Sequence, residues 1–150
     1  MSRTLPWTIL VGLTSVLVCV SASQPQFLDD RNSFMKGFVT HELLATLGIM
    51  LTVTLASTAT LHLELNKLQQ LTQDKFEKTR SAIRLSAYSL IACFVLATVL
   101  VVVKPMCGQY GILVALLNSF SLIILYFTIS VLYDLTRAAF KIPAISDVSD

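Results

Sequence analysis

The sequence predicts an all-α integral membrane protein with four transmembrane helices. Hydrophobic residues make up 55% of the 150-residue chain and charged residues only 13%, more apolar surface than a soluble domain of this size buries. Four windows contain no Lys, Arg, Asp or Glu: residues 5–23, 43–63, 85–103 and 111–133. Each window can cross about 30 Å of hydrocarbon as a helix, which satisfies its own backbone hydrogen bonds. We therefore expect one four-helix membrane domain with little protein outside the bilayer.

The first segment, residues 1–26, has a basic start, an apolar middle and a small-residue end, VSAS. Cleavable signal peptides share this order of features. We expect the segment to be retained as a signal anchor that forms the first helix, over residues 5–23. Cleavage would instead leave a three-pass protein.

The next segment, residues 24–42, mixes charges with Phe27, Leu28, Phe34, Met35 and Phe38. Two interpretations stay open for it. It can form a short amphipathic helix at the membrane interface, or a plain connecting loop with buried aromatic side chains.

The second and third helices are predicted over residues 41–72 and 78–104. Neither glycine nor proline occurs from residue 49 to residue 104, so both helices are expected to continue past the membrane as a polar hairpin. About eight residues of each arm, at 1.5 Å per residue, would project roughly 12 Å. A leucine stripe and a basic run on this hairpin predict a docking surface for a cytoplasmic effector protein. Its candidate residues are Leu68, Leu71, Lys75, Lys78 and Arg80.

The fourth helix is predicted over residues 111–140, followed by a mobile tail at residues 141–150. Asn118 lies near the middle of this helix. An unpaired amide in hydrocarbon is costly, so Asn118 should face another helix or a cavity.

Small and hydroxyl residues recur every four positions along the second helix, at Gly48, Thr52, Ala56 and Thr60. Helices in lipid attract one another mainly through close packing, which small residues permit. This ridge therefore predicts packing within the chain, a contact between subunits or the wall of a pore. We expect a homo-oligomer of about four subunits, because four thin helices leave a large surface facing lipid.

Basic residues are distributed unevenly over the expected four-pass arrangement. Eight of the eleven lie on one side: Arg3, Lys67, Lys75, Lys78, Arg80, Arg84, Arg137 and Lys141. The other side holds Arg31, Lys36 and Lys104. The positive-inside rule then predicts an inner-membrane protein whose termini and middle loop are cytoplasmic. Loss of the first segment would leave the middle loop and the C-terminus on the same side.

The sequence carries no signature of an enzyme: it has no phosphate loop, no dinucleotide fingerprint, no nucleophile elbow and no carboxylate cluster. We therefore expect no catalytic residue, metal or cofactor. The net charge of +2 is too small to indicate direct binding of nucleic acid. Cys19 and Cys107 are both expected on the outer side, and the sequence leaves open whether they pair.

The end of the last predicted helix, ISVLYDLTRAAF, resembles the last helix of the membrane partner in the lambda Rex phage-exclusion pair, which ends in LYNLTR. The loose similarity runs from about residue 39 to residue 137, with HELLATLGIMLTVTLAS opposite an equally small-rich helix. The membrane subunit of the Kiwa defence system is another small four-helix protein of this general kind. The resemblance implies a membrane component of bacterial anti-phage defence that works with a cytoplasmic partner. It supplies no functional residues.

These features predict a non-enzymatic inner-membrane subunit that oligomerises and transmits a membrane disturbance to a cytoplasmic effector. One alternative is a small ion channel or pore-forming protein that acts alone. Another is a structural subunit of a larger membrane complex. A channel needs a continuous polar line, and the ridge on the second helix is the candidate for it.

Overall fold

The computed structural model describes residues 5–72, 77–108 and 110–139. These residues form four long helices, α1 (Leu5–Ser23), α3 (Leu43–Thr72), α4 (Glu77–Val103) and α5 (Gly111–Ala139). A short helix, α2 (Ser33–Gly37), lies in the connection between α1 and α3, and no strand occurs among the described residues. The all-α prediction is confirmed. The long helices begin and end within two residues of the expected positions.

Three segments are long and apolar enough to span a bilayer: Ser33–Leu63, Arg80–Cys107 and Gly111–Arg137. The chain is therefore a membrane protein by the length and composition of its helices. The apolar part of α1, Thr8–Ser23, is shorter than these three spans.

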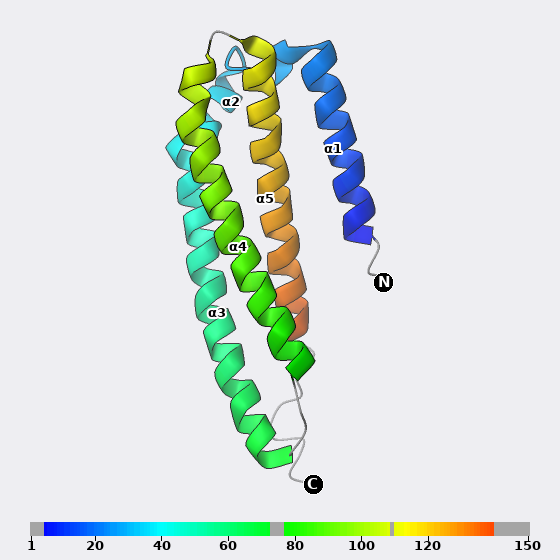
Figure 1. Cartoon of the computed structure of the whole chain (residues 1–150), viewed down its shortest axis with the longest axis vertical. Coiled ribbons are helices and arrows are strands. Elements are labelled where there is room, and N and C mark those ends of the chain that lie inside the picture. The colour runs from blue at the N-terminus through cyan, green and yellow to red at the C-terminus, as the bar shows by residue number, and fades with distance from the viewer. Residues whose placement is uncertain (1–4, 73–76, 109, 140–150) are drawn as a thin grey trace.

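The long helices run alternately up and down (Figure 1). We call the end that carries residues 24–42 and 104–108 the loop end, and the end at which α3 finishes and α4 begins the hairpin end. The helices α3, α4 and α5 lie side by side between these ends, while α1 accompanies α5 only near the loop end (Figure 1). At 1.5 Å per residue, the 19 residues of α1 measure about 28 Å and the 30 residues of α3 about 45 Å.

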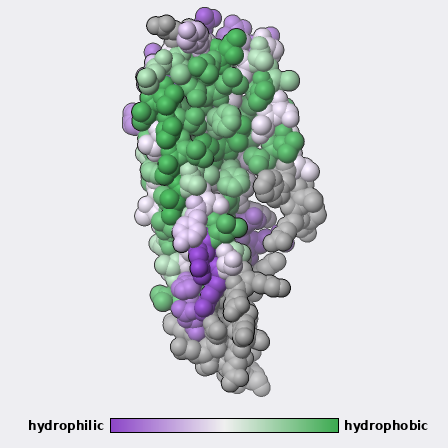
Figure 2. Space-filling model, viewed as in Figure 1, coloured by the Kyte–Doolittle hydropathy of each residue, from purple (hydrophilic) through white to green (hydrophobic). Residues whose placement is uncertain are grey.

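The main core lies toward the loop end, where Leu43, Leu47, Ala97 and Ala115 are almost fully buried. A smaller cluster of Ile83, Leu90 and Leu135 joins α4 and α5 toward the hairpin end. Many large apolar side chains point outward instead, and they form a broad hydrophobic surface that gives way to a hydrophilic one toward the hairpin end (Figure 2). Such an outward apolar surface fits lipid as the solvent.

The connection between α1 and α3 folds over the loop end. Asn32 holds its turn, because its side chain donates to the Phe27 carbonyl and accepts from the Phe34 N–H at the start of α2. Leu28 and Met35 are buried, whereas Phe27 and Phe34 are exposed. The segment thus contains a short helix, and the expectation of a loop with buried aromatic residues is wrong for Phe27 and Phe34.

The path from α2 into α3 is broken at two residues. Val39 has φ −82° and ψ 61°, and Thr40 has φ −144° and ψ −145°, both outside the helical region. A break of this kind releases backbone carbonyls from the helical ladder, and those carbonyls need donors from elsewhere. The ammonium group of Lys104 supplies these donors.

Candidate functional site

Lys104 lies at the end of α4 with its side chain only 7% exposed. Its Nζ donates to the carbonyl oxygens of Val39 at 3.2 Å and Met35 at 3.4 Å. The same Nζ forms an ion pair with Asp30 Oδ1 at 2.8 Å. A buried ammonium is tolerated only when it is paired and hydrogen-bonded, and these three oxygens meet that requirement.

Asn118 of α5 joins the same cluster and is fully buried. Its Nδ2 donates to the Leu28 carbonyl at 2.6 Å and lies 3.5 Å from Asp30 Oδ1. Its Oδ1 accepts no hydrogen bond within the described part of the chain. The sequence predicts that Asn118 faces another helix or a cavity, whereas its partners in the structure are Leu28 and Asp30 of the segment between α1 and α3.

Together, Asp30, Lys104 and Asn118 form what we call the loop-end clamp. It ties the segment between α1 and α3 to the ends of α4 and α5. The clamp contains no nucleophile with an adjacent base, and its one ammonium is already neutralised by a carboxylate. Its geometry suits holding the loop end together.

The contact between α1 and α5 is also polar at its centre. Ser21 and Ser119, both almost fully buried, place their hydroxyl oxygens 2.8 Å apart. Ser119 also donates to the Ala115 carbonyl of its own helix at 2.8 Å. Small residues let the two backbones approach, and the hydroxyl pair adds a directed bond in an apolar surrounding.

The ridge on α3 divides between two faces. Gly48 lies against α4, since a Cβ at this position would meet the Phe94 ring at 3.7 Å. Thr52, Ala56 and Thr60 are exposed. A step of four residues turns the ridge about 40° around a helix of 3.6 residues per turn, which carries its later members away from α4. Packing within the chain therefore applies to Gly48 and not to the other three.

The hydroxyls of the ridge are satisfied without water. Thr52 Oγ1 donates to the Gly48 carbonyl at 2.8 Å, and Thr60 Oγ1 donates to the Ala56 carbonyl at 3.1 Å. Buried hydroxyls inside the bundle behave in the same way: Thr54, Ser121 and Thr128 bond the carbonyls of Met50, Leu117 and Ile124. Such bonds within one helix let hydroxyl residues face either lipid or a second helix.

The predicted docking surface is only partly described. Lys75 lies outside the described residues, as do the side chains of Leu68, Leu71 and Lys78. The Arg80 guanidinium is described, and it donates to Asn66 Oδ1 on α3. This bond links the two helices near the hairpin end.

Sequence reasoning missed the clamp, because it counted Lys104 only among the basic residues of the outer side and gave it no partner. A useful signal was available: Lys104 directly follows the apolar window 85–103, and Asp29 and Asp30 are the acidic pair on the same side of the expected membrane. The three cysteines are free, so Cys19 and Cys107 are not paired in this structure. No group of three or more His, Cys, Asp or Glu residues that could hold a metal occurs in the described ranges. Comparisons of the chain with protein-family models, curated proteins and solved structures find no match.

Proposed function

We propose that the chain is a non-enzymatic bacterial inner-membrane subunit that self-associates and relays a disturbance at the membrane to a cytoplasmic effector. The exposure of the α3 ridge carries this proposal. An outward line of small residues with satisfied hydroxyls is suited to close contact with a second copy in lipid. We further propose an assembly of about four copies.

In this proposal α1 is the fourth membrane span, and its length supports the assignment. A helix of about 28 Å matches the hydrocarbon thickness, although its apolar part is shorter than the other three spans. With α1 spanning the bilayer, the 27 to 30 residues of α3, α4 and α5 are longer than the hydrocarbon by about 10–15 Å. That excess would form the cytoplasmic extension at the hairpin end.

The proposed relay depends on the loop-end clamp and on α4, the continuous helix that runs from the clamp to the hairpin end. Lys104 fixes the outer segment to α4, and α4 runs without interruption from there to Glu77. A change at the loop end would therefore shift a rigid helix whose far end carries the proposed effector-docking residues. Packed helices transmit such displacements because their interfaces resist continuous deformation.

The role in anti-phage defence is supported by the resemblance of residues 129–140 to the lambda Rex membrane partner. It predicts that bacteria which produce this chain together with the product of its neighbouring gene lower the plating efficiency of some phages. Equal plating by a panel of phages on producing and non-producing cells would remove defence from the proposal and leave the self-association intact.

Self-association is tested by changing the ridge. Thr52→Leu combined with Ala56→Leu should lower the mass of the detergent-solubilised protein in native mass spectrometry, because bulky side chains keep the helices apart. Val95→Leu combined with Val99→Leu is the matched control, since these exposed residues of α4 are also four apart and already bulky. A monomer before any substitution would eliminate the proposal.

Effector docking is tested by reversing charge near the tip of the hairpin. Lys75→Glu combined with Lys78→Glu should abolish co-purification of the neighbouring gene's product while oligomer mass stays unchanged. Lys36→Glu, on α2 at the opposite end, is the control. Retained co-purification would show that the basic run serves only to hold the hairpin at the membrane.

A pore lined by the ridge remains the second candidate, because Thr52 and Thr60 keep hydroxyl lone pairs facing outward. Flux of ions through proteoliposomes would distinguish it. A pore predicts flux that Thr52→Leu with Ala56→Leu abolishes, and a relay subunit predicts no flux before or after the change.

A further inference from the structure

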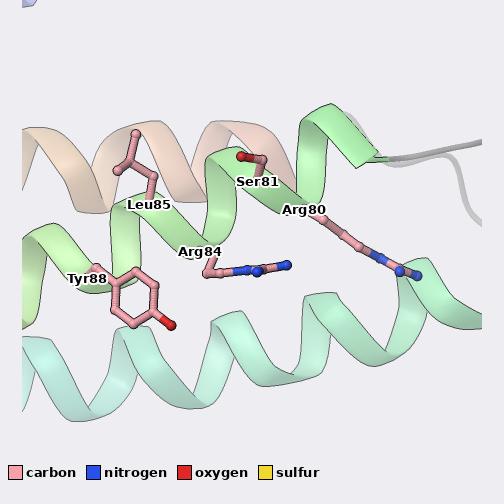
Figure 3. A pocket seen from close by; sticks show the side chains of 5 residues that line it. All are labelled: Arg80, Ser81, Arg84, Leu85 and Tyr88. Carbon is pink, nitrogen blue, oxygen red and sulfur yellow. The ribbon is translucent and has the colours of Figure 1, made fainter.

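A groove of about 360 Å³ lies along one face of α4 near the hairpin end. Its lining residues are Arg80, Ser81, Arg84, Leu85 and Tyr88. They form two rows along α4, each with a spacing of four residues: Arg80, Arg84 and Tyr88 in one row, Ser81 and Leu85 in the other. Figure 3 shows Arg80, Arg84 and Tyr88 on the side of α4 nearer α3, with both guanidinium groups extended toward the hairpin end. Among the described residues, the lining contains two cations and no carboxylate.

The two arginines differ in how they are held. Arg80 donates to Asn66 Oδ1 and is thereby fixed across the α3–α4 pair. Arg84 is exposed and forms no hydrogen bond or ion pair with any residue that the structure describes. A guanidinium is a planar group of N–H donors whose geometry matches phosphate oxygens. The groove therefore presents one anchored cation, one available cation and the Ser81 hydroxyl to an anion.

The position of the groove identifies the source of that anion. Arg84 is the last charged residue before the charge-free window 85–103, so it lies at the level where a bilayer changes from headgroups to hydrocarbon. Leu85 is the first residue of that window and Tyr88 lies one turn after Arg84, and their side chains are 68% and 63% exposed. A soluble phosphate would use the cations only, whereas a phospholipid would also cover these two apolar surfaces.

We propose that the groove binds the phosphate group of an anionic phospholipid, with Arg84 and Arg80 as its cationic ligands and Ser81 as a hydroxyl donor. Leu85 and Tyr88 contact the glycerol and the first acyl carbons of the same lipid. This site goes beyond the proposed relay, because it assigns a specific lipid position at the base of the hairpin and gives Arg80, one of the candidate docking residues, to the lipid. It neither requires self-association nor follows from it.

Native mass spectrometry of the full chain in mild detergent, titrated with phosphatidylglycerol, tests the site directly. Arg84→Gln keeps the length of the side chain and removes its charge, and it should weaken phosphatidylglycerol binding about fivefold. Arg137→Gln is the matched control, an exposed arginine in the last turn of α5 outside the groove. It should change the affinity less than twofold. Phosphatidylcholine, whose phosphate charge is balanced by its choline, should bind more weakly than phosphatidylglycerol to the unmodified chain and lose less affinity on Arg84→Gln.

A second titration separates a lipid from a free anion. Glycerol phosphate carries the same phosphate without acyl chains, and it should compete with phosphatidylglycerol only at concentrations at least a hundredfold higher. Competition at equal concentration would overturn the lipid assignment in favour of a soluble phosphate. Equal weakening by Arg84→Gln and Arg137→Gln would overturn the groove in favour of a diffuse charge effect. Because Arg84 is exposed and unpaired among described residues, its substitution breaks no hydrogen bond or ion pair with them.

Discussion

At the scale of single residues, the most consequential side chain is Lys104. It supplies the donors that the broken segment at Val39 and Thr40 lacks, and Asp30 balances its charge. Buried charge pairs are expensive to break, because the group that remains stays away from water without a partner. A lysine at the end of a membrane helix thus determines how the loop end folds.

Lys104→Met is expected to lower the free energy of unfolding by about 1–3 kcal/mol, since the Val39 carbonyl loses the Lys104 donor and the Met35 carbonyl keeps only the Phe38 N–H. The Asp30 side chain is 41% exposed, so water can solvate it and the loss stays within this range. Unfolding in mixed micelles, followed by circular dichroism, measures the change. Lys36→Met is the control, because Lys36 is exposed on α2 of the same segment. Equal stability of the two variants would contradict the role given to Lys104.

At the scale of elements, the contact between α1 and α5 depends on three small residues, Ser21, Ala115 and Ser119. The Ser21 and Ser119 hydroxyls are 2.8 Å apart, so the two backbones are close enough for a disulfide at these positions. We expect Ser21→Cys with Ser119→Cys, in a chain whose own cysteines are replaced by alanine, to form an intrachain bond on mild oxidation.

Electrophoresis without reductant detects that bond as a faster-migrating monomer band. Ala115→Leu in the same background should reduce its yield several-fold, because Ala115 is fully buried and a larger side chain there separates the helices. Ile112→Leu, at an exposed position in the first turn of α5, should leave the yield unchanged. No cross-link in the double-cysteine chain would mean that α1 does not pack as the structure has it.

The sequence predicts these elements well and their loop-end contacts poorly, for physical reasons. Helix bounds follow from the charge-free windows and from the absence of glycine and proline between residues 49 and 104, both of which are local properties. The requirement that Asn118 be paired is also local, because an amide in hydrocarbon always carries that cost. Its actual partner, the Leu28 carbonyl, lies 90 residues away in the chain, so only the tertiary fold reveals it.

The ridge on α3 also combines a feature that the sequence reveals with one that only the tertiary fold reveals. Its four-residue spacing is visible in the sequence, yet the faces of its members depend on where α4 crosses α3. Gly48 meets Phe94, whereas Thr52, Ala56 and Thr60 turn outward. A regular pattern therefore predicted close helix packing without predicting which members serve the chain itself and which remain available to another copy.

At the scale of the whole molecule, charge and packing together favour one orientation. Three basic residues lie at the loop end, but Lys104 is buried against Asp30, and Arg31 Nε lies 3.7 Å from Asp29. The loop end therefore offers less free positive charge than a count of residues suggests. The hairpin end carries Arg84 and Arg137 as exposed cations. The positive-inside rule counts Lys and Arg, so the proposed cytoplasmic placement of the hairpin end rests on their excess toward that end.

Reporter fusions test this orientation. A reporter that is active only outside the cytoplasm should give no signal when it is fused between residues 70 and 80. Fused between residues 24 and 36, the same reporter should give a strong signal. A cytoplasm-active reporter at the same two sites is the control, and it should give the complementary pattern if both fusions are produced. Activity of the first reporter at residues 70–80 would show the opposite orientation. That result would also contradict the proposed effector docking and the proposed lipid site, because both require the hairpin end to face the anionic cytoplasmic leaflet.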